Sequence, residues 1–294
     1  MVIVRLMGGL GNQMFQYAAA RRLALEQGVP LKLDVSWFAG SRERAYALGG
    51  LNVEATFATT AELEGIIGSS SRGRRARVLS TLKRHLLIGQ GWTWIYEHRL
   101  SPYNRRVRQA RGRVYLDGYW QSERYFAPIA ETIRRDFTVI AQPDGSGREI
   151  ADRIATTESV SVHVRRGDYV SDPQTSPARS VCTPDYYQRC ALRAAEGLAN
   201  PHLFLFSDDP EWVEANLRFE CPTTVVSRTA PGGIYADLRL MSACRRHIIA
   251  NSSFSWWGAW LDPRPDKVVL APRRWMYDAR VDDRDVLPAA WIRM

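Results

Sequence analysis

The chain is poor in the residues that mark zinc-binding and disulfide-stapled proteins. It has four cysteines in 294 residues, Cys182, Cys190, Cys221 and Cys244. None of them forms a C-x-x-C pair, and no histidines follow at the spacing of a zinc site. We therefore expect free, buried thiols and no resident metal ion.

Long apolar runs are also missing. No stretch approaches the roughly eighteen apolar residues that a membrane-spanning helix needs. The amino terminus passes from Met1 directly into a strand pattern, without the basic and apolar regions of a signal peptide. These absences predict a cytoplasmic protein.

Acidic residues are scarce in one segment. Residues 72–113 contain twelve Lys or Arg and a single acid, Glu97, whereas the rest of the chain has 28 bases and 30 acids. This segment alone gives the protein its net charge of +9. Without an RRM-like or helix-turn-helix signature, we do not expect nucleic acid as a partner. Peripheral contact with an anionic membrane and a plain solvated face both remain open.

Strand and helix patterns alternate along most of the chain. Strands are predicted at 2–6, 31–35, 114–120, 159–164, 202–207, 223–227, 247–250 and 267–271. Helices are predicted at 12–27, from about 126 to 137, and at 184–197, 210–217, 233–244 and 253–261. This order is typical of parallel α/β sheets. With a linker at 142–147, it predicts two Rossmann-like doubly wound domains, 1–142 and 143–294, facing a central cleft.

The most informative segment follows the buried strand pattern at 159–162. It reads His163-Val164-Arg165-Arg166-Gly167-Asp168-Tyr169 and places two guanidiniums at the carboxyl end of a strand, where open α/β sheets bind ligands. Paired guanidiniums suit a diphosphate. The alternative is an ordinary solvated pair that closes a strand.

Three further strands end in glycine-rich or polar segments. They are Gly8-Gly9-Leu10-Gly11-Asn12-Gln13, Phe206-Ser207-Asp208-Asp209 and Asn251-Ser252-Ser253-Phe254-Ser255-Trp256-Trp257. The glycines allow close approach to a ligand, and the helix that follows presents its amino end to an anion. The alternative for the glycines is a tight structural turn. Phe254, Trp256 and Trp257 are expected to pack in the core.

These segments resemble the bacterial α-1,2-fucosyltransferases of glycosyltransferase family eleven and, more distantly, the α-1,6- and protein O-fucosyltransferases. The blocks GGLGNQMFQYAAAR, DGYWQSERYF, HVRRGDY, FSDD and NSSFSWWGAWL occur in that family's order between residues 8 and 261. Only the basic middle and about the last thirty residues lack a block.

The resemblance implies a GT-B fold and an inverting transfer of L-fucose from GDP-β-L-fucose to the 2-hydroxyl of a terminal β-galactose. The alternatives are a fucosyltransferase of another linkage and a non-catalytic protein that binds a GDP-sugar or nucleic acid. The resemblance also implies that no metal cofactor is needed. The one Asp-x-Asp match, at 283–285, has no strand before it and is expected to be a solvated charge run. Residues 1–142 would then face the acceptor glycan, with the carboxyl-terminal tail packing back on them, and 143–294 would bind the donor. An acceptor linked to a lipid at the inner membrane would suit the basic segment.

Site roles follow from the same blocks. Arg165 is the strongest candidate to neutralise the departing diphosphate, with Arg166 orienting the loop or contacting donor or acceptor. Asp208 and Asp209 are assigned to guanine or to capping the helix at Pro210. Asp168 is the chosen base for the acceptor proton, with His163 and Asp172 as alternatives. The remaining donor contacts are expected at Gly9, Gly11, Asn12, Gln13, Asn251, Ser252, Ser253 and Ser255.

Overall fold

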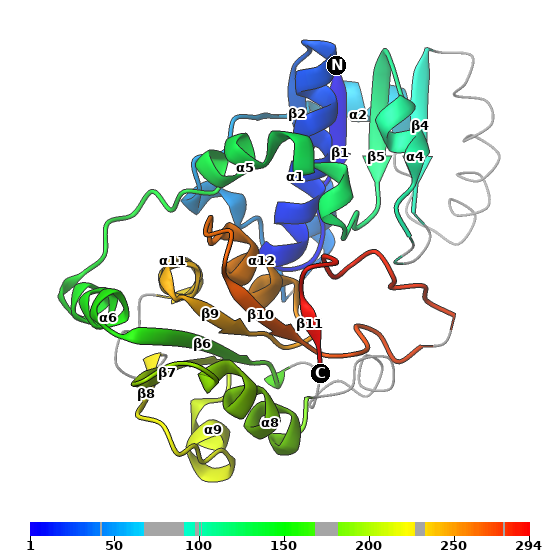
Figure 1. Ribbon diagram of the computed structural model, residues 1–294. Coiled ribbons are helices and arrows are strands. Elements are labelled where there is room, and N and C mark those ends of the chain that lie inside the picture. The colour runs from blue at the N-terminus through cyan, green and yellow to red at the C-terminus, as the bar shows by residue number, and fades with distance from the viewer. Residues whose placement is uncertain are drawn as a thin grey trace. The chain divides into compact units, whose positions relative to one another are not determined.

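The computed structural model consists of two parallel α/β units (Figure 1). It describes residues 1–41, 43–67, 91–97, 100, 102–167, 182–226, 233–278 and 280–294. The contacts between Cα atoms divide the chain into Met1–Thr138 and Val139–Met294, called unit 1 and unit 2 below. In the described part of the chain, no helix is long and apolar enough to cross a membrane.

Unit 1 is built on a parallel five-stranded sheet of order β3-β2-β1-β5-β4. Its strands are β1 (Val2–Arg5), β2 (Leu31–Asp34), β3 (Thr56–Phe57), β4 (Trp92–Tyr96) and β5 (Arg113–Asp117). Its α-helices are α1 (Leu10–Gln27), α2 (Thr60–Ile67), α4 (Arg105–Gln109) and α5 (Ala130–Asp136). Short 3-10 helices lie at Ser36–Gly40, Leu48–Gly50, Glu123–Tyr125 and Ala127–Ile129.

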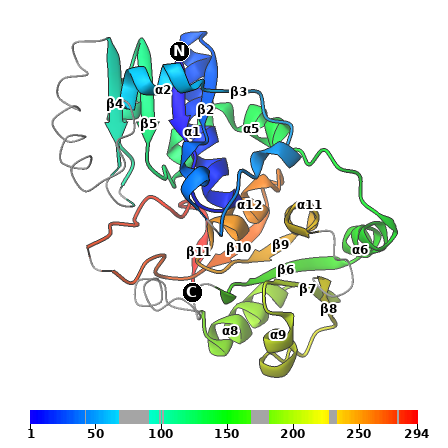
Figure 2. The same cartoon turned by 180° about the vertical axis from the view of Figure 1, so that it is seen from behind.

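Helices cover both faces of this sheet. Ile3 and Tyr115 point to the face where Ile66 of α2 packs, and because side chains alternate along a strand, Val2 and Val4 point to the opposite face. Figures 1 and 2 show α1 and α4 over one face and α2 over the other. The sequence predicted α1 and its end at Gly28, where φ is +61°.

Unit 2 has a parallel six-stranded sheet of order β11-β10-β9-β6-β7-β8. The strands are β6 (Glu158–Val164), β7 (Pro201–Ser207), β8 (Thr223–Val225), β9 (Arg246–Ile248), β10 (Val268–Ala271) and β11 (Ile292–Arg293). The helices are α6 (Gly145–Thr156), α8 (Pro184–Ala195), α9 (Pro210–Asn216), α11 (Gly233–Ala243) and α12 (Ser253–Leu261).

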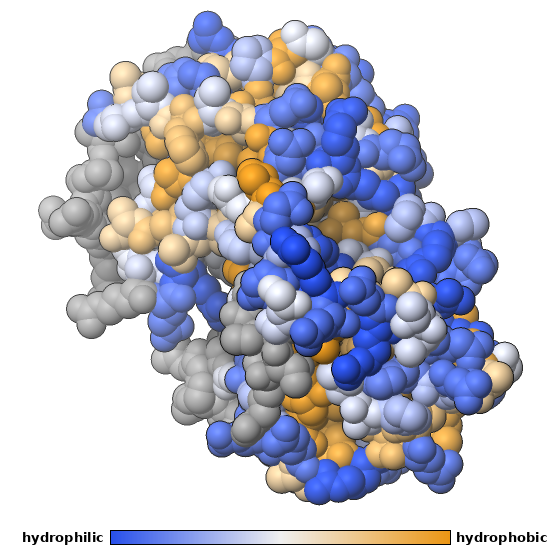
Figure 3. Space-filling view, turned by 90° about the vertical axis from the view of Figure 1, so that its left-hand side faces the viewer, coloured by the Kyte–Doolittle hydropathy of each residue, from blue (hydrophilic) through white to orange (hydrophobic). Residues whose placement is uncertain are grey.

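The core of unit 2 is double-sided, as a doubly wound sheet requires. Val160, Val162 and Val164 of β6 face α8 and α9, whereas Phe204 and Phe206 of β7 face α6 and α11. The face shown in Figure 3 is largely hydrophilic, with apolar residues in separate areas.

One sequence expectation needs correction here. The linker predicted at 142–147 is already helical from Gly145, because Asp144 caps α6 by accepting a hydrogen bond from the Gly147 N–H at 2.7 Å. The last strand of the carboxyl-terminal tail, β11, pairs with β10 in the sheet of unit 2. The packing of the tail on the first domain stays a prediction.

Candidate active site

The order of strands in unit 2 reverses between β6 and β9. From β6 the chain proceeds to β7 and β8 on one side, and from β9 it proceeds to β10 and β11 on the other. In open α/β sheets such a switch point, at the carboxyl ends of the strands, is where ligands bind. The segments that follow β6 and β9 are the HVRRGDY and NSSFSWW segments, so the structure brings two predicted site segments to one place.

Arg165 is held in place by the FSDD segment after β7. Its Nη1 lies 2.7 Å from Asp208 Oδ2, and the other carboxylate oxygen, Oδ1, accepts the Arg166 backbone N–H at 2.9 Å. The side chain of Arg165 is 23% exposed, so the guanidinium is partly accessible and fixed from one side. A Cβ added at Gly167 would meet Asp208 Oδ2 at 2.5 Å. Glycine at 167 therefore gives the carboxylate room to hold Arg165.

Arg166 is engaged more fully than a solvated arginine would be. Its Nε pairs with Asp209 Oδ2 at 3.2 Å, and its guanidinium carbon lies 3.9 Å from the centre of the Trp212 ring. Asp209 Oδ1 also accepts the Trp212 N–H at 3.1 Å, and Pro210 follows as the first residue of α9. The expected helix cap is thus confirmed for Asp209. All four carboxylate oxygens of Asp208 and Asp209 have partners within unit 2, and the guanine contact stays a prediction.

His163 lies at the end of β6 and is 6% exposed. Its ring is 5.7 Å from that of Phe254, which belongs to the segment after β9. Its Nδ1 is buried, and none of the residues that the structure describes forms a hydrogen bond with it. Burial, aided by the positive charge of Arg165, lowers the pKa of His163 to about 3. The imidazole is therefore neutral at physiological pH, and a proton taken up by it would be held weakly.

The segment after β9 divides into buried and half-buried members. Asn251 donates to the Trp275 carbonyl at 3.3 Å, and the Ser255 hydroxyl donates to the Ser252 carbonyl at 3.1 Å. Ser252 occupies the cap position of α12 without a side-chain cap, and Ser253 is half-buried at the first helical position. Trp256 and Trp257 are fully buried, which confirms their packing role.

Unit 1 has a switch point of its own between β1 and β5. The glycine segment follows β1, and the DGYWQ segment follows β5. Asn12 Oδ1 accepts from Gln121 Nε2 at 2.8 Å and joins the two. Gly8 has φ +75°, and a Cβ there would lie 2.6 Å from Asn12 Nδ2. A structural turn at Gly8 is therefore required, whatever else the glycines Gly9 and Gly11 do.

Gln13 differs from the expectation that it contacts the donor. Its side chain is fully buried, and its amide donates to the carbonyls of Gly8 and Ala45, both at 2.9 Å. Its oxygen accepts from the Ala47 N–H at 2.8 Å. Both amide protons of Gln13 are donated to carbonyl groups of unit 1, so Gln13 holds the glycine segment and the chain at 45–47 together.

Comparison with known proteins places the chain in a family. The family model described as glycosyl transferase family 11 matches residues 95–294. An α-1,2-colitosyltransferase of Escherichia coli is 33% identical over 100% of this chain and 98% of its own length. The O-antigen biosynthesis glycosyltransferase WbnK, also of Escherichia coli, is 32% identical over 92% of this chain and 93% of its own.

The chain belongs to glycosyl transferase family 11. It is therefore a glycosyltransferase, and the resemblance noted in the sequence is confirmed. Among solved structures, a mutant of Arabidopsis thaliana FUT1 in complex with GDP matches with a TM-score of 0.51 at 13% identity, covering 98% of this chain and 74% of that one. The two parallel α/β units and this likeness make the fold GT-B-like.

Sequence reasoning missed one contact that shapes the DGYWQ segment. Glu97, 7% exposed, accepts the backbone N–H groups of Tyr119 at 2.6 Å and Trp120 at 3.0 Å. Trp120 is the one residue other than glycine with positive φ, +55°, in the described ranges, and a Cβ at Gly118 would lie 2.5 Å from Glu97 Cβ. The signal was Glu97 itself, the lone acid of the basic segment.

Two carboxylate predictions end differently. Asp168, the chosen base, and Asp172, its alternative, lie outside the described residues. The Asp-x-Asp match at 283–285 was expected to be a solvated charge run, and Arg284 is indeed 72% exposed, whereas Asp283 is half-buried. Its Oδ2 accepts the N–H groups of Trp275 at 2.8 Å and Met276 at 2.9 Å, so it stabilises a turn. No group of three or more His, Cys, Asp or Glu residues fit to hold a metal occurs within the described ranges.

Proposed function

We propose that this enzyme transfers L-fucose from GDP-β-L-fucose to the 2-hydroxyl of a terminal β-galactose, with inversion and without a metal cofactor. Unit 2 binds the donor, and unit 1 faces the acceptor. The observation that carries the proposal is Arg165, which follows β6 beside the switch point between β6 and β9 and pairs with Asp208 after β7. A guanidinium at a switch point is suited to a nucleotide diphosphate.

The chemistry makes demands that this arrangement meets. As the bond from fucose C1 to the β-phosphate oxygen breaks, negative charge grows on GDP and the sugar becomes cationic. A donor group already in position stabilises that state without reorganising. Because Asp208 holds Arg165 from one side, its planar fork is oriented before the nucleotide arrives. The guanidinium of the neighbouring Arg166 is held in place by its stacking on Trp212.

The acceptor hydroxyl attacks the face of C1 opposite GDP and loses its proton. We propose Asp168 as the group that takes it, three residues after Arg165 in the sequence. His163 is the alternative. Its neutral ring can accept a hydrogen bond from the hydroxyl, but with a pKa of about 3 it holds a full proton poorly.

A second donor is favoured by the colitosyltransferase relative. Colitose is L-fucose without its 3-hydroxyl, so the two GDP sugars differ by one polar group. A site that hydrogen-bonds the 3-hydroxyl rejects the sugar that lacks it. A site with an apolar surface at that position discriminates only weakly between the two sugars. Assaying GDP-fucose and GDP-colitose side by side with galactosides, and determining the linkage by NMR, decides between them.

The acceptor is proposed to be a bacterial glycan precursor, carried on a lipid at the inner membrane. The support is the O-antigen role in the name of one relative and the positive charge of residues 72–113. The enzyme would then be cytoplasmic and peripheral to that membrane, bound through charge.

The decisive experiment compares Arg165→Ala and Arg165→Lys with the wild-type enzyme. We expect Ala to lower kcat/KM by about a thousandfold and Lys by less, because lysine keeps the charge and loses the fork. Arg189→Ala is the matched control, since Arg189 forms a surface pair with Asp185 on α8. If folded Arg165→Ala turns over near the wild-type rate, the proposed role of Arg165 is wrong.

A further inference from the structure

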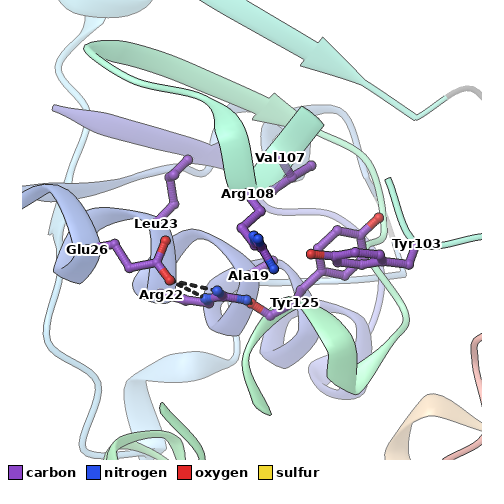
Figure 4. A pocket seen from close by; sticks show the side chains of 8 residues that line it. All are labelled: Ala19, Arg22, Leu23, Glu26, Tyr103, Val107, Arg108 and Tyr125. Atoms are coloured by element: carbon purple, nitrogen blue, oxygen red, sulfur yellow. Dashed lines mark hydrogen bonds and ion pairs between the residues drawn. The ribbon is translucent and has the colours of Figure 1, made fainter. Parts of the chain in front are cut away.

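Unit 1 contains a cavity of about 340 Å³ beside the short helix α4. It is lined by Tyr103, Arg105, Arg108, Gln109 and Arg124. A much smaller pocket adjoins it and shares Tyr103 and Arg108 with it. Figure 4 shows that pocket, in which Arg22 of α1 pairs with Glu26. The larger space, called the arginine cavity below, has the size of a small-ligand site.

The lining of the arginine cavity is strongly positive. Three of the five lining residues that the structure describes are arginines, and none of these five is acidic. Arg105, Arg108 and Gln109 stand three and four residues apart on α4 and so share one face of the helix. In the described part of unit 1, no carboxylate forms an ion pair with Arg105 or Arg108. Gathering like charges without counter-charges is unfavourable, and a bound anion would offset it.

The cavity walls are fixed by contacts. Val107, 3% exposed, anchors α4, and the Asn104 side chain caps it by accepting from the Arg106 N–H. The Asn104 backbone N–H donates to the Tyr125 hydroxyl at 2.8 Å.

The opposite wall is tied to α1. Arg22 donates to the carbonyls of Arg124 at 3.4 Å and Tyr125 at 3.3 Å. The Arg124 guanidinium lies 4.6 Å from the centre of the Tyr103 ring. Stacking of this kind limits where the guanidinium can point. The arginine cavity is therefore built from both walls before any ligand binds.

We propose that the arginine cavity binds a phosphate or diphosphate group. Guanidinium forks match phosphate oxygens in pairs, and a cavity of polar lining suits a compact anion rather than an apolar ligand. None of the described residues that line the arginine cavity belongs to the glycine segment. Arg22, which lines the smaller adjoining pocket, is ten residues beyond Asn12 on α1, about 15 Å along the helix axis. The phosphate comes either from a free phosphate ester or from the headgroup of a lipid.

Inorganic pyrophosphate is the probe, and calorimetric titration is the measurement. GDP is kept in excess so that the diphosphate site proposed in unit 2 is occupied. Arg108→Gln removes a lining charge, whereas Arg106→Gln removes an equal charge from the same helix at an exposed residue outside the lining. We expect Arg108→Gln to weaken pyrophosphate binding about tenfold or more, and Arg106→Gln to change it by less than about twofold.

Each outcome of this titration can be told apart from the outcomes of the experiment on Arg165, which tests donor transfer. Equal weakening in the two variants would mean that only diffuse charge attracts the anion, and the proposal would be overturned. Absence of binding to the wild type in excess GDP would overturn it as well. Co-sedimentation with phosphatidylcholine vesicles, with and without phosphatidic acid, identifies the source. Binding that needs phosphatidic acid and Arg108 assigns the cavity to a lipid headgroup, whereas binding of pyrophosphate alone assigns it to a soluble ester.

Discussion

The carboxylate of Glu97 is expected to decide whether the DGYWQ segment keeps its shape. It accepts two backbone N–H groups while 7% exposed, and hydrogen bonds to a charged acceptor are worth roughly 1.5–3 kcal/mol each. The substitution also removes the desolvation cost of the buried carboxylate, which offsets part of the free energy lost with the two hydrogen bonds. We therefore expect Glu97→Ala to destabilise unit 1 by about 3 kcal/mol.

Two companion variants make this prediction specific. Glu97→Gln keeps an acceptor oxygen without the charge, and about half the loss is expected, because neutral hydrogen bonds are weaker. Glu131→Ala removes a glutamate whose side chain is 93% exposed in a surface pair with Arg134, and such pairs contribute about 0–1 kcal/mol. Urea unfolding followed by fluorescence measures all three.

If Glu97→Ala costs no more than Glu131→Ala, the two hydrogen bonds do not hold Trp120 in its positive-φ conformation. A loss of stability should also be accompanied by a lower kcat/KM, because Gln121 follows Trp120 directly and bonds Asn12.

Two further predictions concern unit 2. His163 has a folded-state pKa of about 3 against 6.5 unfolded, so its contribution to stability is complete above pH 6.5 and declines as the pH falls toward 3. At pH 5 the free energy of unfolding is lower by about 2 kcal/mol for this reason. In His163→Asn, the free energy of unfolding should therefore fall less steeply between pH 6.5 and pH 3 than in the wild type. Gly167→Ala forces Asp208 away from Arg165, so kcat/KM should fall about tenfold or more with a small change in Tm. Gly145→Ala, where a Cβ meets nothing within 4 Å, should leave kcat/KM unchanged.

The strand ends were predictable because local patterns determine them. A buried strand followed by polar or glycine residues is visible in sequence at Arg165, Asp208 and Asn251, and all three follow parallel strands of one sheet. Which strands are neighbours was not predictable. That β6 lies between β7 and β9 depends on packing among segments tens of residues apart, and no local pattern records it.

The errors have equally physical causes. Asp144-Gly145-Ser146-Gly147 has the composition of a turn, but the cap at Asp144 and the burial of Ile150 and Ile154 make it the start of α6. The strand β4 was overlooked inside the basic segment, although its aromatic and β-branched residues favour a strand. Gln13 was assigned to the donor because sequence shows an amide near glycines and cannot show that the amide is already satisfied.

The tryptophans of unit 2 have a practical consequence for experiments on this enzyme. Trp256 stacks on Trp260 with ring centres 6.1 Å apart and meets Trp257 at 5.0 Å and Trp291 at 5.3 Å. Indoles this close couple their electronic transitions and give a circular dichroism couplet. The signal originates from one half of the chain alone, so it reports whether that half melts together with the other or on its own.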